Sequence, residues 1–221
     1  MPVDTLVCII DDDAAIRESL GLLLYAGDLR SVSYSSADAF LADQALEDID
    51  CLLLDIRMPG TDGLELFRIL KRRRFAAPVI FITGHGDIPL AVSAIKQGAF
   101  DFLTKPFMEG ELLAKVRAAI DHSRSEQQQR LELQKLQSRV DACTPREQDV
   151  MQFLVRGLSN KGIAETLGIS PRTVEIHRAH VMEKMEADSL PTLVRMIAML
   201  DANDANDGPP AGPESSSSPF N

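Results

Sequence analysis

Short apolar runs alternate with stretches of helical periodicity over the first half of the chain. The runs are typical of buried strands, and the stretches between them repeat apolar residues every three or four positions, as amphipathic helices do. The five expected strands are Thr5–Ile10, Ser31–Tyr34, Cys51–Leu54, Val79–Ile82 and Phe100–Leu103. Strands that alternate with helices favour a parallel sheet covered on both faces. The pattern therefore predicts a doubly wound α/β domain with a five-stranded parallel sheet.

Helical spacing follows each apolar run. The expected helices are Ala14–Tyr25, Ala37–Leu41, Leu64–Leu70, Leu90–Ile95 and one that begins near Glu109. The polar, Gln-rich stretch 122–140 has strong helix propensity, so it is expected to continue the last helix as a linker. One apolar seam, Leu133, Leu136 and Val140, leaves a weak coiled coil and a plain helical spacer equally open.

The rest of the pattern is helical. Thr144 suits an N-cap and Pro145 a first helical position, and Gly157 is expected to end that helix. Three more helices are expected at Asn160–Leu167, Pro171–Met185 and Ser189–Met199. The tight turn Gly168–Ser170 between two short helices is typical of a helix-turn-helix, although periodicity alone fits a four-helix interaction domain equally well.

These patterns divide the chain into four segments. We expect an α/β domain at 1–121, a helical linker at 122–140, an all-α domain at 141–200 and a tail at 201–221. The tail has almost no apolar content and is rich in Pro, Gly and Ser, so it is expected to be disordered. A length of 221 residues agrees with two modest domains.

Charge and cysteine content narrow the class of protein. The net charge of −10 argues against a chain that binds nucleic acid by bulk charge alone. No apolar run approaches the ~20 residues of a membrane span, and no leader is visible, so a cytoplasmic chain without membrane contact is expected. Three distant cysteines predict reduced thiols rather than disulfides or a zinc site. The run Lys71–Arg74 (KRRR) is interpreted as a solvated helix end rather than a nucleic-acid patch.

Polar residues stand where four of the predicted strands end. They are Asp11, Asp12, Asp55, Thr83 and Lys105. The carboxyl ends of parallel strands meet at one edge, where open α/β sheets bind ligands. Carboxylates gathered there repel one another, and Mg²⁺ relieves that repulsion while it keeps positions open for phosphate oxygens. A lysine and a hydroxyl beside the metal complete a set of groups suited to phosphoryl transfer.

Four segments of this domain resemble the receiver domains of two-component response regulators. They are IIDDD at Ile9–Asp13, LLLDIRMPGTDG at Leu52–Gly63, FITGHGD at Phe81–Asp87 and AFDFLTKPF at Ala99–Phe107. The resemblance implies that Asp55 accepts a phosphoryl group from a sensor histidine kinase. It further implies that Mg²⁺ or Mn²⁺ is held by Asp11, Asp12 and Asp55, with help from the backbone carbonyl of Arg57.

The same resemblance implies a switch. Lys105 would pair with the phosphoryl group, and its peptide bond to Pro106 would be cis. Thr83 and Phe102 match the switch pair, in which the hydroxyl moves to the phosphate and the ring turns into the space vacated. Phosphorylation adds about −1.5 to −2 charges within reach of a threonine and a lysine, so the physics agrees. The rearranged face would make a homodimer.

The helical domain resembles the LuxR-type DNA-binding domains of response regulators of the NarL and FixJ kind, over about Cys143–Met199. The segments SPRTVEIHRAHVMEKM and SLPTLVRM are most similar to the FixJ subgroup. By position, phosphates would be contacted by Asn160 and Lys161. The major groove would be faced by Arg172, Thr173, Glu175, Ile176 and Ala179. The groove edge or backbone would be contacted by His177, Arg178 and Lys184.

Together these features predict a phosphorylation-activated transcriptional regulator. It would not be an enzyme beyond accepting a phosphoryl group and removing it again. Its partners would be a sensor histidine kinase, promoter DNA and a second copy of the chain, with RNA polymerase as a further candidate. The alternative is a phosphorelay or protein-interaction protein that does not bind DNA, because 141–200 carries a net charge of −1. A metal-dependent phosphatase is disfavoured, because Arg57 stands where a second Asp is usual.

Overall fold

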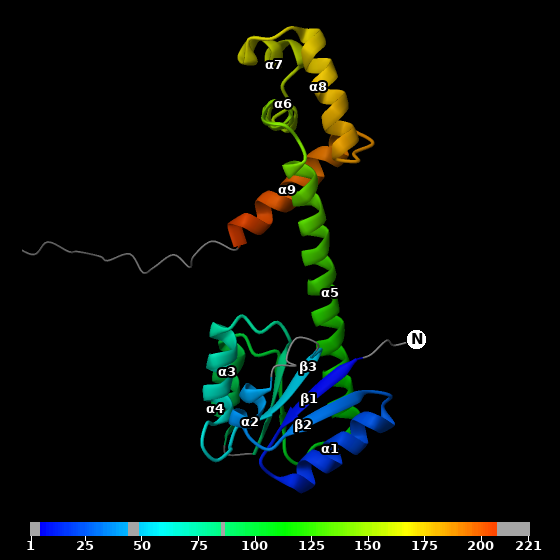
Figure 1. Ribbon diagram of the computed structural model, residues 1–221. Helices are drawn as coiled ribbons and strands as arrows, with labels where there is room; N and C mark the ends of the chain where they lie inside the picture. Colours follow the sequence, from blue (N-terminus) through cyan, green and yellow to red (C-terminus); the bar gives the residue numbers. More distant parts are fainter. Residues whose placement is uncertain (1–4, 44–48, 85–86, 207–221) are drawn as a thin grey trace, which may run out of the picture. The chain divides into compact units, whose positions relative to one another are not determined.

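The computed structural model describes residues 5–43, 49–84 and 87–206 (Figure 1). The chain forms two compact units, residues 1–128 and 129–221. No helix in the described part of the chain is long and apolar enough to cross a membrane. All three cysteines are buried and free, as the sequence predicts. Burial raises the pKa of Cys8 and Cys51, which keeps both thiols protonated.

One parallel sheet organises the described part of the first unit. Its strands are β1 (Leu6–Ile10), β2 (Arg30–Tyr34), β3 (Cys51–Asp55), β4 (Val79–Thr83) and β5 (Asp101–Thr104). The order across the sheet is β2-β1-β3-β4-β5, and every pair is parallel. All five predicted strands are thereby confirmed. Because the order reverses beside β1, the carboxyl ends of β1 and β3 flank the switch point at which such sheets bind ligands.

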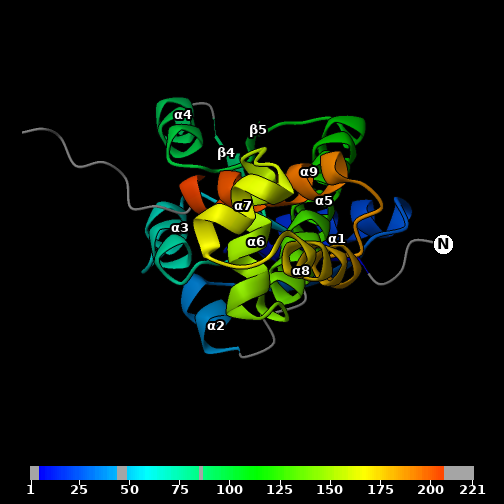
Figure 2. The ribbon, with the colours of Figure 1, turned by 90° about the horizontal axis from the view of Figure 1, so that it is seen from above.

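Helices cover both faces of this sheet. They are α1 (Ala14–Ala26), α2 (Ala37–Ala42), α3 (Gly63–Arg72), α4 (Ile88–Lys96) and α5 (Glu109–Asp141). Figure 2 shows α2, α3 and α4 on one side of the sheet and α1 and α5 on the other. The expected continuation of the last helix through 122–140 is confirmed, because α5 is one unbroken helix of 33 residues.

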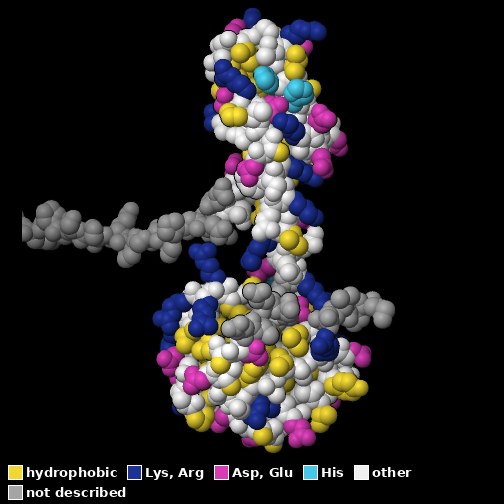
Figure 3. Space-filling model, viewed as in Figure 1, with side chains coloured by type: hydrophobic (Ala, Val, Ile, Leu, Met, Phe, Trp, Pro, Cys, Tyr) yellow, Lys and Arg dark blue, Asp and Glu magenta, His cyan; other side chains and the backbone are white. Residues whose placement is uncertain are grey.

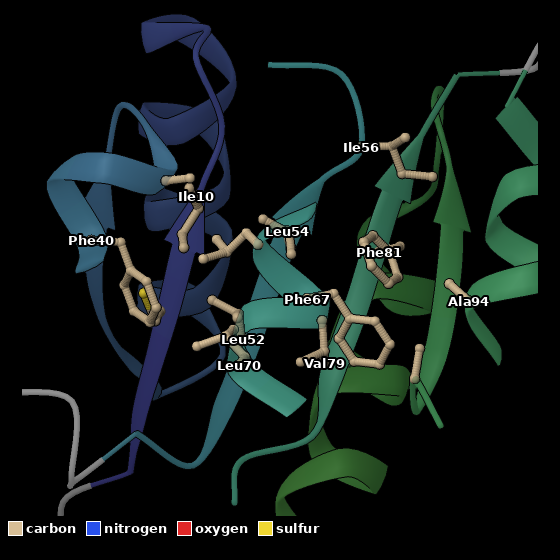
Figure 4. Close-up of a cluster of buried hydrophobic side chains, with 14 of the residues drawn as sticks. Ile10, Phe40, Leu52, Leu54, Ile56, Phe67, Leu70, Val79, Phe81 and Ala94 are labelled. Carbon is tan, nitrogen blue, oxygen red and sulfur yellow. The ribbon is translucent and has the colours of Figure 1, made fainter. Parts of the chain in front are cut away.

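Alternate residues of the central strands β1, β3 and β4 feed two separate cores. Leu52 and Leu54 of β3 point toward α2, α3 and α4, where they pack with Phe81, Phe40 and Phe67 (Figure 4). The residues between them belong to the opposite core, which is closed by α1 and α5. Strands buried on both faces read as continuous apolar runs, which is why the sequence pattern located them.

The second unit is helical throughout its described part. Its helices after α5 are α6 (Pro145–Val155), α7 (Asn160–Leu167), α8 (Pro171–Lys184) and α9 (Leu190–Asn206). One apolar cluster joins them, built around Val150, Ile163, Val174, Val181 and Leu193. A third cysteine, Cys143, is buried beside it at the end of α5.

The structure corrects the expected start of the tail. α9 continues to Asn206, so residues 201–206 are helical rather than disordered. Extending an existing helix adds one hydrogen bond for each residue fixed, and the alanines in this stretch favour a helix. α9 therefore continues beyond its last apolar residue. The remaining expected tail, 207–221, lies outside the described residues.

Candidate functional site

The carboxyl edge of the sheet brings together the polar residues that the sequence singled out. Asp11 follows β1, Asp55 ends β3, Thr83 ends β4 and Lys105 follows β5. They line one open hollow of about 420 Å³, together with Asp12, Arg57 and Asp87. Asp11, Asp55 and Thr83 are buried, whereas Asp12 is exposed. The sheet therefore places these groups as the sequence predicts.

Lys105 bridges the two buried carboxylates. Its Nζ donates to Asp55 Oδ1 at 2.7 Å and to Asp11 Oδ2 at 2.8 Å. Burial lowers the pKa of Lys105, but the hydrogen bonds to both carboxylates outweigh it and raise the pKa. Lys105 therefore stays charged, and one positive charge faces two negative ones. The Lys105–Pro106 peptide bond is cis, as expected.

Asp55 is held at both oxygen atoms. Besides Lys105 at Oδ1, the backbone N–H of Arg57 donates to Oδ2 at 2.7 Å. Burial raises the pKa of Asp55, and the hydrogen bond and charge of Lys105 oppose that rise without cancelling it. The carboxylate is thus oriented by two donors at the rim of an open hollow.

Arg57 also makes a contact that sequence reasoning missed. Its Nε and Nη2 donate to Asp87 Oδ1 at 2.8 and 2.6 Å. Asp87 is buried and immediately precedes α4. Arg57 therefore joins the loop that holds Asp55 to the start of α4. The sequence carried no signal for this pair, because Asp87 stands four residues past the end of β4.

The oxygen atoms at this edge suit a hard divalent cation, since Mg²⁺ prefers carboxylate and carbonyl ligands. Asp11 and Asp55 contribute two carboxylates that Lys105 leaves with excess negative charge. The predicted third carboxylate, Asp12, is exposed, and no group of three or more His, Cys, Asp or Glu side chains close enough to hold a metal occurs among the described residues. The donor chemistry fits, and two of the three predicted carboxylates stand together.

Thr83 and Phe102 lie on the same face of the sheet. Phe102 is the register partner of Phe81, and Thr83 follows Phe81 by two positions, so all three point the same way. The half-buried ring of Phe102 packs on the core that contains α3 and α4. The Thr83 hydroxyl donates to the carbonyl oxygen of Gly84 at 3.1 Å.

In the second unit, α7 and α8 form the predicted helix-turn-helix. Ser159 caps α7 and Ser170 caps α8 through their hydroxyl oxygens. Gly168 ends α7 with φ of 65°, a left-handed conformation that glycine adopts without strain. The turn between the two helices, Gly168–Ser170, is where the sequence predicts it, whereas the cap Ser159 is seen only in the structure.

The expected DNA contacts on α7 and α8 differ in exposure. The exposed ones are Lys161, Arg172, Glu175, Ile176 and Ala179, and the half-buried ones are Asn160, Thr173, His177 and Arg178. The Arg178 guanidinium donates to Asn160 Oδ1 at 3.4 Å, which joins the two helices. Ile176 is 50% exposed in the middle of α8.

Lys184, one of the expected groove-edge or backbone contacts, is paired within its own unit. Its Nζ donates to Glu147 Oε2 at 2.6 Å and to the carbonyl oxygen of Ala142 at 3.1 Å. Glu147 is buried and also accepts from the backbone N–H of Thr144, which completes a capping box. Lys184 therefore ties α8 to α6 as a structural cation and is not a free phosphate contact.

Glu147→Gln should make the stability of the second unit less dependent on pH in the acidic range. The hydrogen bond from Lys184 and the backbone N–H of Thr144 lower the pKa of Glu147 to about 2, from 4.5. Because the folded state lowers this pKa, the stabilisation is present above about pH 4.5 and is lost as pH falls toward 2. We expect the variant to lose about 2 kcal/mol near neutral pH.

Thermal unfolding of the full chain at several pH values would check this. The difference in unfolding free energy between wild type and variant cancels the contributions of the other carboxylates. The gap between wild type and variant should close between pH 4.5 and 2. A gap that stays constant through that range would show that the Glu147 carboxylate charge contributes nothing. Asp149→Gln, at a half-buried position on the same helix, serves as the control.

Comparisons with known proteins agree with both units. Residues 7–117 match the response regulator receiver domain, and residues 141–197 match the luxR family of bacterial regulatory proteins. The transcriptional regulatory protein FixJ of Azorhizobium caulinodans is 48% identical over 88% of this chain and 92% of its own. Full-length FixJ from B. japonicum is 43% identical over 90% of this chain and 98% of its own, with a TM-score of 0.56.

The response regulator StyR, of known structure, is similar as well. It is 39% identical, with a TM-score of 0.79, over 89% of this chain and 99% of its own. The relatives span both units in the same order, which excludes a phosphorelay protein without a DNA-binding domain as the family. The chain belongs to the FixJ-like response regulators, phosphorylation-dependent transcriptional regulators that join a receiver domain to a LuxR-type DNA-binding domain.

Proposed function

We propose that Asp55 is the phosphoacceptor and that its phosphorylation lets α8 engage promoter DNA. One observation carries the proposal: Lys105 and the Arg57 amide hold both oxygens of a buried carboxylate at the open rim of the sheet. An Asp held in this way is oriented for attack yet accessible to a donor. The domain boundaries expected at residues 121 and 140 remain predictions.

The first step is transfer from a phosphohistidine of a sensor kinase. An oxygen of the Asp55 carboxylate attacks phosphorus, the O–P bond forms, and the P–N bond breaks with its electron pair left on the imidazole. Lys105 lies 2.7 Å from the carboxylate, where it can follow the negative charge onto the phosphoryl oxygens. Positioning and charge therefore account for the transfer, as in other phosphoryl-transfer sites.

Receiver domains generally bind Mg²⁺ at the phosphorylation site. Here Asp11 and Asp55 would hold it, with Asp12 and the backbone carbonyl of Arg57, and Mn²⁺ offers the same ligand preference. The metal supplies positive charge to the phosphoryl oxygens. Response regulators with a DNA-binding domain are typically not enzymes, and self-dephosphorylation by water from the open hollow is the one reaction that we propose.

Phosphorylation would reach the surface through Thr83 and Phe102. The Thr83 hydroxyl would leave Gly84 for the phosphoryl group, and the Phe102 ring would move into the space vacated on the same face. α4 lies on that face and exposes four large aliphatic side chains, Ile88, Leu90, Val92 and Ile95, each 36–42% exposed. A second copy of the chain would cover them, which makes the active form a homodimer.

The dimer would present two copies of α8 to a two-fold operator. The proposed base contacts are Arg172, Thr173, Glu175, Ile176 and Ala179, with Asn160, Lys161, His177 and Arg178 at the backbone and groove edge. Arginine can read guanine and a carboxylate can accept from cytosine N4, while an exposed aliphatic side chain suits a thymine methyl group. RNA polymerase stays a predicted partner at such a promoter.

Sedimentation and DNA selection test the proposal together. With acetyl phosphate and Mg²⁺ the full chain should shift from monomer to dimer, and it should enrich a two-fold symmetric sequence from a random duplex library. Phosphorylation without a shift from monomer to dimer would contradict the proposed dimerisation. A dimer that enriches no sequence would contradict the proposed sequence-specific DNA binding.

Arg172→Ala should weaken operator binding and relax sequence preference. Arg172 is exposed near the start of α8, the end of a recognition helix that contacts base edges. We expect a loss of about 1–3 kcal/mol at the selected operator and a smaller loss on random DNA. Fluorescence anisotropy on both duplexes would measure it. Arg195→Ala on α9 removes the same charge from the same unit and should leave the ratio between the duplexes unchanged.

A further inference from the structure

Five cations gather at the carboxyl end of α3. They form the basic cluster, Arg68, Lys71, Arg72, Arg73 and Arg74, and all five are exposed. Figure 3 shows dark blue side chains collected at this part of the first unit. Residues 1–121 carry a net charge of −7 with these five cations included and −12 without them, so the basic cluster lies within a strongly acidic unit.

The basic cluster is unpaired. Within residues 5–43, 49–84 and 87–206, no salt bridge or side-chain hydrogen bond joins any of its five cations to another residue. Cations at a helix carboxyl end are favoured by the dipole, but that effect acts only within the last turn. It accounts for Lys71 and Arg72, which α3 contains in its last turn, and not for Arg73 and Arg74 beyond them.

The second unit, by contrast, uses several of its cations internally. Lys184 is bound to Glu147, Arg139 to Glu186 and Arg146 to Asp149. Phosphate neutralisation supplies most of the sequence-independent affinity for DNA. Cations of the second unit that are paired with its own carboxylates are less available to DNA phosphates. Cations elsewhere in the chain can therefore contribute to the neutralisation of those phosphates.

Arg74 occupies a backbone position that favours another residue. Its φ is 56°, in the left-handed region where glycine or asparagine is usual after a helix. The left-handed backbone conformation does not stabilise arginine, and the Arg74 side chain has no partner among the described residues. The chain therefore keeps a positive charge at a position where arginine is conformationally unfavourable.

We propose that the basic cluster binds the phosphate backbone of DNA while the second unit reads the sequence. The inference rests on the proposed DNA-binding function and adds a second, sequence-independent contact from the receiver unit. Contacts to phosphates carry no sequence information, so a cluster of cations can bind DNA of any sequence. Because the second unit holds the chain on DNA, even a weak contact gains from the high effective concentration.

The salt dependence of binding tests this contact. Fluorescence anisotropy of the phosphorylated full chain on a random-sequence duplex, at a series of NaCl concentrations, gives the slope of log K against log[salt]. The slope is negative, and each lost phosphate contact reduces its magnitude by about 0.9. Each lost contact also weakens binding roughly fivefold near physiological salt. Arg72→Ala/Arg73→Ala/Arg74→Ala should therefore reduce the magnitude of the slope by about 2 to 3.

Two single variants separate charge from folding. Arg74→Gly removes the cation and relieves the positive φ, so its melting temperature should hold or rise while the magnitude of its slope falls by about 1. Arg117→Ala removes one cation from α5, on the other side of the sheet, and should leave the slope unchanged.

Wild-type slopes and affinities in both cluster variants would overturn the proposal while leaving the DNA-binding function intact. Normal DNA binding together with lost binding to poly-L-glutamate would assign the basic cluster to an acidic protein instead. A wild-type chain that binds no duplex would remove the DNA-binding function itself, and this inference with it.

Discussion

Asp55→Asn should abolish phosphorylation and with it the formation of the dimer. The amide cannot attack phosphorus as a carboxylate does, and the variant removes one of the two charges that Lys105 bridges. Intact-mass spectrometry after treatment with acetyl phosphate and Mg²⁺ should find one added phosphoryl group on wild type and none on the variant. Sedimentation of the same samples should show a dimer for wild type alone.

Asp28→Asn provides a matched control for this result. It makes the same change at an exposed position of the same unit, and asparagine tolerates the φ of 60° there. The control should be phosphorylated and should dimerise like wild type. If Asp55→Asn gained a phosphoryl group at the wild-type rate, the acceptor would be another residue and the proposed mechanism would be wrong.

Gly63→Ala should destabilise the receiver unit and slow its phosphorylation. Gly63 begins α3, and a Cβ added there would lie 2.1 Å from the backbone oxygen of Asp55. Backbone atoms cannot move aside as a flexible side chain can, so either α3 or the end of β3 must shift. We expect a loss of about 3 kcal/mol, at the upper end of overpacking costs, because the clash involves the main chain.

Urea unfolding and the rate of phosphorylation would measure both effects of Gly63→Ala. Gly110→Ala is the control, because a Cβ at Gly110 in the first turn of α5 meets nothing within 4 Å. That control should be neutral or more stable by about 0.5–1 kcal/mol, since alanine favours a helix. Equal stability of the two variants would show that α3 adjusts without strain.

The sequence predicted much of this architecture because its signals are local. The run Cys51–Leu54 is apolar at every position, since β3 is buried on both sides. The residues placed at strand ends, Asp11, Asp55, Thr83 and Lys105, do converge at one edge. Their convergence follows from parallel strands alone, so it needed no knowledge of side-chain contacts.

What escaped prediction depends on pairs of residues distant in sequence. Arg57 and Asp87 are thirty positions apart, and Lys184 and Glu147 thirty-seven, so no periodicity marks either pair. Lys184 looked like a DNA contact because it stands on α8, and only packing against α6 shows that its charge is already used. The extension of α9 to Asn206 was missed because composition describes residues one by one, whereas helix growth is cooperative.

The sheet has a mechanical consequence for how a signal leaves the receiver unit. In the proposed switch Phe102 would move within the core of α3 and α4, whereas α5 is anchored in the separate core on the opposite side. The strand layer separates the two cores, because successive side chains of the central strands enter opposite ones. We expect α5 to keep its packing through the switch, so the second unit would receive the message from a neighbouring copy rather than through its own connecting helix.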